Sequence, residues 1–481
     1  MTDNIREKIN RDVLFFLLIA GIASVPLMTN YIIAGSSLAS ELSHIEVISR
    51  EIGKVFPVRI GVWGSMDYGY SAASFQANVC YLLPVFFRLI GMGTGNAYKW
   101  AMLLYNLGTI VTAYVCFSKC FNVREAGMIA GMLYTWCPYR LSEMYLVGDL
   151  GEIAGWMFFP LLILGLKRLY MENGEEDSYG SLWVLLTWGY SLILLTSTVL
   201  LFGAVCMTVL LLLYMGKRTL RKMTLMVIGK TAAAVLLINA WFLVPMLLRT
   251  REPSAVAVLI PRDIRGKGMY LMQYLTTFSW GGDSVELTAN GLRDAQAMGP
   301  GIAVILLGLV LIWMLFTGQC RQDKGFDFTR RMLWVSGTIM FLSVNLFPWD
   351  LFQDKNALFS ILLALMGTPA KLGIAACVGL IFVAGQTVAW LGDNRTQKER
   401  LVLMLLVTSI SFGTTQFLLG NILSTKQFAR GDDIQALSAL ELPMITQESA
   451  MWRLSEAVSA VALCGCIIMC IVRRRGRDKK V

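Results

Sequence analysis

The sequence predicts an all-α polytopic membrane protein with about twelve transmembrane helices. Of its 481 residues 56% are hydrophobic and 15% are charged, with a mean hydropathy of +0.60. A soluble protein of this length does not carry so apolar a sequence. The Lys and Arg residues lie in short clusters between apolar runs, where they act as orientation signals. The formal net charge of +10 therefore reflects topology, and we exclude nucleic acid as a partner.

The first apolar run covers residues 13–34 and follows a basic N-terminal segment, MTDNIREKINRDV. A cleaved signal peptide begins in a similar way. The run is long enough to span a bilayer and many apolar runs follow it, so we expect an uncleaved anchor. Arg6, Lys8 and Arg11 place the N-terminus in the cytoplasm.

Residues 35–59 leave this span and predict an amphipathic helix on the outer membrane surface. Ser36 or Ser37 can supply the N-cap, and the segment FPVR ends the helix. One stripe of the helix is polar and holds the only histidine of the chain. This stripe is either a solvated face or part of a functional site. The apolar stripe contains Leu38, Leu42, Ile45, Ile48, Ile52 and Val55, and the polar stripe contains Ser37, Glu41 and His44.

The next apolar run, residues 71–92, contains Pro84 and Arg88. If it spanned the membrane, Lys119 and Arg124 would face outward against the positive-inside rule. We therefore expect a second outer-surface or re-entrant helix, so that 35–96 is an external loop with interfacial helices.

The remaining apolar runs alternate across the membrane within one integral domain, 1–481, and both termini are cytoplasmic. The chain then divides into spans at 97–248, an external loop at 249–300, C-terminal spans at 301–472 and a basic cytoplasmic tail at 473–481. The predicted spans after the first are 97–117, 125–137, 153–166, two within 181–215, 223–248, 301–316, 332–347, 372–391, 401–419 and 454–472. A short segment at 356–366 stays near the outer surface.

Charged residues from distant loops gather on the outer face, whereas the inner face has only basic orientation clusters. No nucleotide-binding motif occurs on the inner face. A collection of carboxylates and cations without a nucleotide site suits transfer of a sugar from a lipid phosphate carrier. The acceptor hydroxyl then needs a carboxylate as general base, and the leaving phosphate needs cationic donors.

The ten cysteines include no CxxC pair and no Cys/His metal spacing, so we expect packing residues. The acidic pair Asp432 and Asp433 is more typical of a solvated loop than of a metal site. We therefore assign no metal ligands and no cofactor, and the need for a divalent cation stays open.

The first third of the chain contains the motifs HIEVISREIGKVFPVRI, DYGY, AYK, LYTWCPYRL, GDLGE and FFPLLILG. Together these motifs resemble a group of bacterial polytopic proteins, the YfhO-like proteins, which are similar to GT-C glycosyltransferases. The resemblance is fainter at NAWFLVP and TPAKL, where relatives tend to have an arginine in place of Lys371. It implies a GT-C-like fold, a polyprenyl-phosphate-linked sugar donor and a cell-envelope glycan or protein acceptor. It also implies a bacterial cytoplasmic membrane, with membrane lipids as partners.

The sequence departs from this group at one position, because Ser37 stands where an acidic residue is expected after the first span. A serine is no general base at neutral pH without a partner that takes the proton. Either Glu41, one helical turn on, has taken the role, or Asp149 or Glu152 provides the base, or the protein does not catalyse transfer. For the donor phosphate and substrate we predict contacts from His44, Arg59, Arg140, Arg262, Arg265 and Lys371.

Two other classes of function remain open. A flippase or polysaccharide transporter also needs external cations for a lipid phosphate, but it favours broken helices at mid-membrane and paired halves. Lys230 and Asn239 are the few polar breaks in the spans. A non-catalytic accessory membrane protein would explain Ser37.

Overall fold

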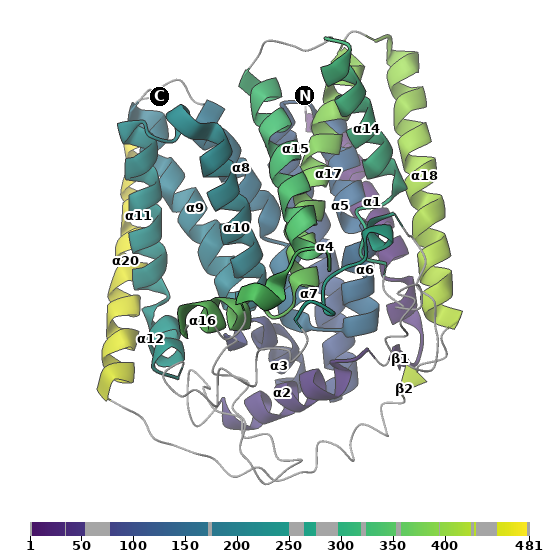
Figure 1. The fold of residues 1–481 in the computed structure, drawn as a ribbon. Helices are drawn as coiled ribbons and strands as arrows, with labels where there is room; N and C mark the ends of the chain where they lie inside the picture. The colour runs from purple at the N-terminus through teal and green to yellow at the C-terminus, as the bar shows by residue number, and fades with distance from the viewer. Residues whose placement is uncertain are drawn as a thin grey trace.

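The protein folds into a long helical bundle in the computed structural model (Figure 1). The structure describes residues 2–33, 35–52, 77–171, 176–249, 264–275, 297–318, 324–352, 357–393, 395–424, 428–429 and 450–478. The long helices run roughly side by side. The N-terminal end of the first helix α1 and the C-terminal end of the last helix α20 lie at the same end of the bundle. In order along the chain, the bundle contains α1 (Thr2–Ala23), α4 (Thr94–Phe121), α5 (Arg124–Thr135), α7 (Leu150–Trp156), α8 (Phe159–Met171), α9 (Glu176–Thr196), α10 (Thr198–Met215), α11 (Lys222–Ile238), α14 (Ile302–Phe316), α15 (Lys324–Ser343), α17 (Pro369–Asp393), α18 (Gln397–Ser424) and α20 (Ala450–Asp478).

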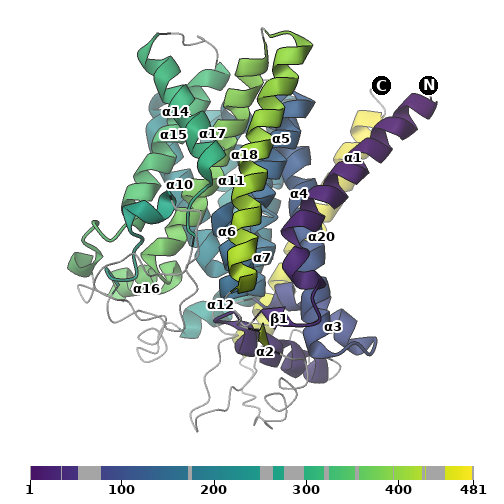
Figure 2. The same cartoon turned by 90° about the vertical axis from the view of Figure 1, so that its right-hand side faces the viewer.

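The end of the bundle away from the termini carries shorter elements, several of which lie across the bundle (Figures 1 and 2). We call it the loop end. A two-stranded antiparallel ribbon, in which Ile32 pairs with Ala429, joins the start of the chain to its last third there. The shorter elements of the fold are η1 (Val25–Met28), β1 (Ile32–Ile33), α2 (Leu38–Glu51), η3 (Asn78–Tyr81), α3 (Leu82–Leu89), α6 (Pro138–Ser142), η4 (Glu143–Val147), η5 (Gly216–Arg218), α12 (Ala240–Arg249), η6 (Leu271–Tyr274), η7 (Trp349–Phe352), α16 (Ala357–Met366) and β2 (Phe428–Ala429).

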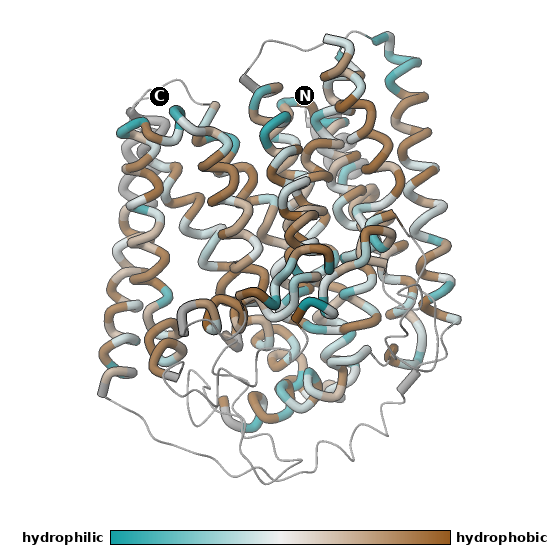
Figure 3. The backbone as a smooth tube through the Cα atoms, in the orientation of Figure 1, coloured by the Kyte–Doolittle hydropathy of each residue, from teal (hydrophilic) through white to brown (hydrophobic). Residues whose placement is uncertain are grey.

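Apolar residues cover most of the length of the bundle helices, and polar residues are more frequent towards their ends (Figure 3). By length and composition, five helices of the described residues can cross a membrane, or six if the pair α11 and α12, bent by 75°, is one span. Four further apolar helices are shorter. These helices support a multi-pass membrane protein, whereas the count of about twelve spans stays a prediction.

Ion pairs hold together the helix ends on the side of the termini. Arg124 at the start of α5 pairs with Asp12 of α1, and Asp327 of α15 pairs with Arg218 of η5 at 2.7 Å. The basic clusters expected to lie on one side of the membrane therefore meet at one end of the bundle. The segment at 71–92 forms η3 and α3 among its described residues, and its position outside the membrane span stays a prediction.

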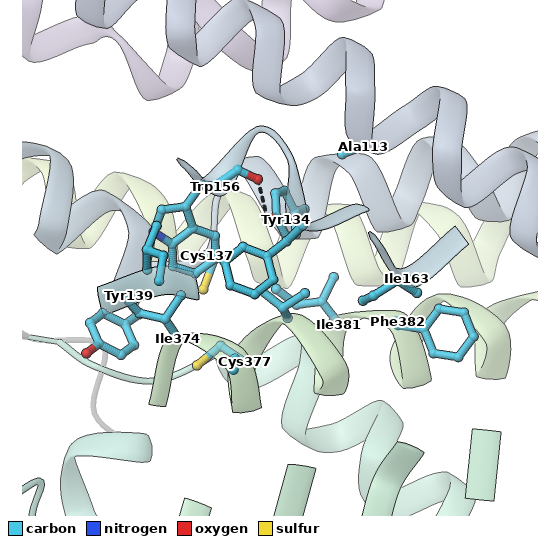
Figure 4. Packing of buried hydrophobic residues seen from close by; sticks show 14 of the residues in the cluster. Ala113, Tyr134, Cys137, Tyr139, Trp156, Ile163, Ile374, Cys377, Ile381 and Phe382 are labelled. Atoms are coloured by element: carbon cyan, nitrogen blue, oxygen red, sulfur yellow. Dashed lines mark hydrogen bonds between the residues drawn. The ribbon is translucent and has the colours of Figure 1, made fainter. Parts of the chain in front are cut away.

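A buried aromatic and aliphatic core fastens α17 to α5 and α6 (Figure 4). The Tyr134 hydroxyl donates to the carbonyl of Trp156 at 2.5 Å, and the Tyr139 hydroxyl donates to the carbonyl of Ala370 at 2.8 Å. The Trp156 carbonyl lies at the C-terminal end of α7, where carbonyls lack helical partners, and both buried hydroxyls have a hydrogen-bond acceptor. These contacts fix the start of α17, and with it Lys371, relative to α6 and α7.

Candidate active site

Helix α2 begins one residue after Ser37, although the Ser37 side chain makes no capping hydrogen bond. The backbone holds this start instead, because the amides of Ser36 and Ser37 donate to the carbonyls of Leu146 and Val147, both at 2.9 Å. A Cβ atom on Gly35 would lie 2.6 Å from the Val147 carbonyl oxygen, so only glycine allows this close approach.

The apolar stripe of α2 faces the protein, and Leu38, Leu42, Ile45 and Ile48 are buried. Glu41 on the polar stripe is buried as well, with 3% of its surface exposed, so the polar stripe is not a simple solvated face. The Tyr81 hydroxyl donates to Glu41 Oε1 at 3.1 Å, and the Leu150 amide donates to Oε2 at 3.2 Å. Glu41 therefore ties α2 to η3 and to the first turn of α7.

The segment GDLGE turns the chain from η4 into α7. Gly148 has a φ of +79°, which favours glycine, and its carbonyl accepts from the Tyr98 hydroxyl at 2.7 Å. Asp149 is the N-cap of α7, and its Oδ1 accepts from the amide of Glu152 at 2.9 Å. A carboxylate at this position satisfies an unpaired amide and interacts well with the helix dipole.

Lys371 at the start of α17 bridges two buried carboxylates. Its Nζ lies 2.8 Å from Glu143 Oε2 and 2.5 Å from Glu152 Oε2. The two glutamate side chains are 2% and 7% exposed, and that of Lys371 is 20% exposed. The structure thus brings Glu41, Asp149, Glu152 and Lys371 of the predicted site together at the loop end.

Burial and neighbouring charge change the acidity of this group. Burial raises the pKa of Glu41 well above its usual value, and the nearby charge of Asp149 raises it further. Burial together with the charge of Glu152 raises the pKa of Asp149 to about 6. Asp149 is half-buried, whereas Glu41, Glu143 and Glu152 are buried. Asp149 is therefore the carboxylate of this group that is best exposed to a substrate.

Arg140 occupies a different environment from the one predicted for a phosphate ligand. It is 1% exposed, and its guanidinium donates to Asn106 Oδ1 at 2.9 Å, to the Thr135 carbonyl at 3.0 Å and to Thr109 Oγ1 at 3.3 Å. These neutral acceptors join α4 to the end of α5. Its contact with a donor phosphate stays a prediction, because nothing in the described geometry tests it.

Arg265, another predicted cation, does not join the carboxylate group. Arg265 is exposed and donates to the Asn345 carbonyl at 3.0 Å, and it lies 3.9 Å from Asp350. Arg59 and Arg262 lie outside the described residues. Convergence of these arginines on one phosphate stays a prediction.

His44 lies beside the group rather than within it. Its Nδ1 is 3.5 Å from the Tyr81 hydroxyl oxygen, at the outer limit of hydrogen-bond length, and the two rings pack with centroids 5.3 Å apart. Burial lowers the pKa of His44 to about 4, although a hydrogen bond to the backbone of Ser40 opposes the shift. His44 is therefore neutral at physiological pH.

Sequence reasoning missed two residues of this group, Tyr81 and Glu143. Tyr81 lies in an apolar run where an aromatic residue has no distinctive pattern. Glu143 has no local feature that sets it apart from other charged residues, and its ion pair with Lys371 joins residues 228 positions apart. No local pattern reveals such a contact.

Among the residues that the structure describes, no group of three or more His, Cys, Asp or Glu side chains could hold a metal ion. Glu143 and Glu152 already share the ammonium of Lys371.

The arrangement of helices is shared with solved membrane glycosyltransferases. The arabinofuranosyltransferase AftD from Mycobacteria aligns with a TM-score of 0.52 and 12% identity over 85% of this chain and 27% of AftD. The oligosaccharyltransferase of Archaeoglobus fulgidus aligns with a TM-score of 0.52 and 13% identity over 86% of this chain and 55% of the enzyme. The chain has a GT-C-like fold.

This likeness is one of fold, since the identities are low. The chain spans about a quarter of the length of AftD and about half of the oligosaccharyltransferase. No protein-family model matches the sequence, and no curated protein matches it.

Proposed function

We propose that this protein is a GT-C-like membrane glycosyltransferase, related to the YfhO-like group, of the bacterial cytoplasmic membrane. It transfers a sugar from a polyprenyl-phosphate carrier to a cell-envelope acceptor at the extracytoplasmic face. The observation that carries the proposal is the half-buried Asp149 beside Glu41, Glu143, Glu152 and Lys371, at the end of the bundle away from the termini. This group is joined to a fold found in two sugar transferases.

In the proposed reaction Asp149 is the general base. It accepts the proton of the acceptor hydroxyl while the acceptor oxygen bonds to the anomeric carbon and the bond from that carbon to the phosphate oxygen breaks. A pKa of about 6 suits a base that acts near neutral pH, because the group is ionised and still basic. Asp149 thus fills the role of the acidic residue that Ser37 replaces.

Lys371 is the described cation that lies closest to this chemistry. Two of its ammonium hydrogens are directed to Glu143 and Glu152, which leaves one for an oxygen of the leaving phosphate. Glu143 and Glu152 hold the ammonium in place, and Arg59 and Arg262 from the outer loops are proposed as further phosphate ligands.

The test is a transfer assay with purified protein, polyprenyl-phosphate-linked sugars and an acceptor extract. Asp149→Asn removes the base but keeps a good N-cap for α7, so the protein should fold. We expect transfer to fall by about 10²-fold or more. Glu125→Gln, an exposed glutamate of α5 at the other end of the bundle, is the matched control and should retain full activity.

The same assay separates the alternative functions. Loss of transfer in Glu41→Gln or Glu152→Gln, with Asp149→Asn active, would assign the base elsewhere. Movement of the lipid carrier across vesicles without transfer would make the protein a flippase. Wild-type inactivity with every donor would favour the accessory protein.

A further inference from the structure

A chain of polar contacts leads away from the candidate site along α2. The Leu150 amide donates to Glu41, the Tyr81 hydroxyl lies 3.1 Å from the other Glu41 oxygen, and the same hydroxyl lies 3.5 Å from His44 Nδ1. Glu41 and Tyr81 are buried, and His44 is only half-buried. The chain therefore starts at the residue after Asp149 and ends at a side chain that is partly exposed.

We propose that Glu41, Tyr81 and His44 form a proton relay that releases one proton for each proton that Asp149 takes up. The purpose of the relay rests on the proposed transfer reaction, whereas its existence does not. Tyr81 is the bridging residue, because its single hydroxyl hydrogen can face Glu41 or His44 but not both at once.

The electrostatic reason is the closeness of the two carboxyl groups. While Asp149 is ionised, its charge keeps the proton on Glu41. When Asp149 accepts the proton of the acceptor, this repulsion disappears and Glu41 becomes more acidic. The net charge of the buried pair then stays constant if Glu41 releases its proton, which avoids a change of charge in a medium of low polarity.

The transfer balances atom by atom. The O–H bond of the Glu41 carboxyl breaks as an O–H bond forms at Tyr81, and the original Tyr81 O–H bond breaks as an N–H bond forms at His44 Nδ1. The ring then gives up its Nε2 proton to water, which leaves neutral His44 in the other tautomer. Before the next turnover Asp149 returns its proton to the Glu41 carboxylate through water, and the His44 ring loses its Nδ1 proton to water and takes one up at Nε2. No oxidant or reductant takes part.

Several ionisable groups of the described residues surround this relay. Glu41 and His44 share α2, where His44 also bonds to the backbone of Ser40. Tyr81 and Cys80 come from η3, Tyr98 comes from α4, and Asp149 and Glu152 lie at the start of α7. Glu46 on α2 is held by Arg88 and Thr94 and by Arg50. The relay thus links its proton to the Asp149 site and not to the Glu46 ion pairs.

The sequence allows a direct test, because His44 is the only histidine of the chain. The full-length protein is labelled with ¹⁵N-histidine, purified through a tag without histidine and titrated by NMR, which reports the tautomer of one ring. We expect the wild-type tautomer to change with pH as Glu41 titrates. Glu41→Gln, whose amide donates to Tyr81 as a protonated Glu41 would, should fix the Nε2–H tautomer. Tyr81→Phe should abolish the pH response.

The control is Tyr105→Phe, which removes a hydroxyl that donates to the carbonyl of the neighbouring Cys80 at 2.6 Å. This variant should keep the wild-type response. Identical titrations of the wild type, Glu41→Gln and Tyr81→Phe would overturn the relay. If Tyr81→Phe does not fold, the comparison of the His44 tautomer between the wild type and Glu41→Gln still tests the relay.

The transfer assay adds a second readout. Tyr81→Phe should lower kcat by about ten-fold while KM is unchanged, because proton release and not binding is affected. Inactivity of the wild type in the transfer assay would contradict the proposed function, whereas the NMR titration would still test the relay. A pH-independent His44 tautomer in an active wild type would remove the relay alone.

Discussion

At the scale of single residues, Lys371 is the position where charge and burial are most closely linked. Its ammonium is shared by Glu143 and Glu152, which come from η4 and α7. Two buried carboxylates around one cation leave an excess of negative charge, to which an ionised Asp149 adds. Such a group is stable only while its cation is present.

Replacement of Lys371 by methionine should therefore be strongly destabilising. We expect a loss of about 3–5 kcal/mol in the free energy of unfolding, since Glu143 and Glu152 would be left without a cation. Lys371→Arg keeps the charge and should cost much less. Thermal unfolding in detergent measures both, with Lys267→Met, at an exposed lysine, as the control. Equal stability of Lys371→Met and Lys371→Arg would show that the ion pairs do not hold α17 in place.

The pH dependence of transfer should report Asp149. A general base acts only when ionised, and the pKa of Asp149 is raised to about 6 by burial and by the charge of Glu152. The kcat/KM should therefore rise with pH, reach half its maximum near pH 6 and stay level above it. Rates from about pH 4.5 to 8 measure this profile. A rate that is constant across this range would exclude Asp149 as the base.

At the scale of elements, α2 is a fixed part of the bundle rather than a loosely attached surface helix. Glu46 accepts from Arg88 Nε at 3.0 Å and from Thr94 Oγ1 at 2.9 Å, which ties α2 to α3 and to the start of α4. Burial alone would raise the pKa of Glu46, but these hydrogen bonds and the charges of Arg88 and Arg50 lower it below its usual value.

Glu46→Gln should lower stability by about 1–3 kcal/mol, because hydrogen bonds to a charged carboxylate are lost. A lowered pKa in the folded state means that this stabilisation is present above the usual glutamate pKa and is lost as the pH falls through the folded value. The difference in melting temperature between wild type and variant should therefore be constant at neutral pH and shrink at acidic pH. A difference that grows on acidification would contradict the ion pair.

Gly35 tests how α2 is joined to η4. Gly35→Ala places a Cβ 2.6 Å from a backbone oxygen, which cannot rotate away as a side chain can. We expect a loss of about 1–3 kcal/mol in stability and a displaced α2. Gly21→Ala, where no atom lies within 4 Å of the added carbon, is the matched control. Equal melting temperatures of the two variants would show that the contact between Gly35 and η4 is loose.

At the scale of the whole molecule, the two ends of the bundle differ (Figures 1 and 2). One end carries the N-terminal end of α1 and the C-terminal end of α20, and the other carries α2, α3 and the carboxylate group. The basic clusters and their ion pairs lie on the side of the termini. From the positive-inside rule we expect this end to be cytoplasmic and the candidate site to face outward.

Reporter fusions after Arg168, Arg331 and Arg475 should all report the cytoplasm. Fusions in the segments 35–96 and 249–300 should report the outside. An external signal after Arg331 would contradict the predicted order of spans and would require a different path for α14 and α15.

Sequence alone determined most of the helices, because apolar length, helix breakers and charge clusters are local properties. The break at Ser197 between α9 and α10 and the short helix α16 follow from such patterns, whereas the surface position of α16 and the non-spanning run at 71–92 stay predictions. The fold class, all-α and GT-C-like, also followed from the sequence and its motifs. Helix α2 covers Leu38–Glu51 within the helix predicted at 35–59, and the predicted part beyond residue 52 lies outside the described residues.

Only the tertiary structure decided which charges meet. It brought Glu41, Asp149 and Glu152 to Lys371, added Glu143 and Tyr81, and placed Arg140 among neutral acceptors in the core. The physical reason is that a side chain's charge and its use depend on burial and on partners that are more than a hundred residues away in the chain, for example Glu41 and Leu150. A sequence pattern records the residue types at a site, whereas the packing of helices determines which of them share a proton or a counterion.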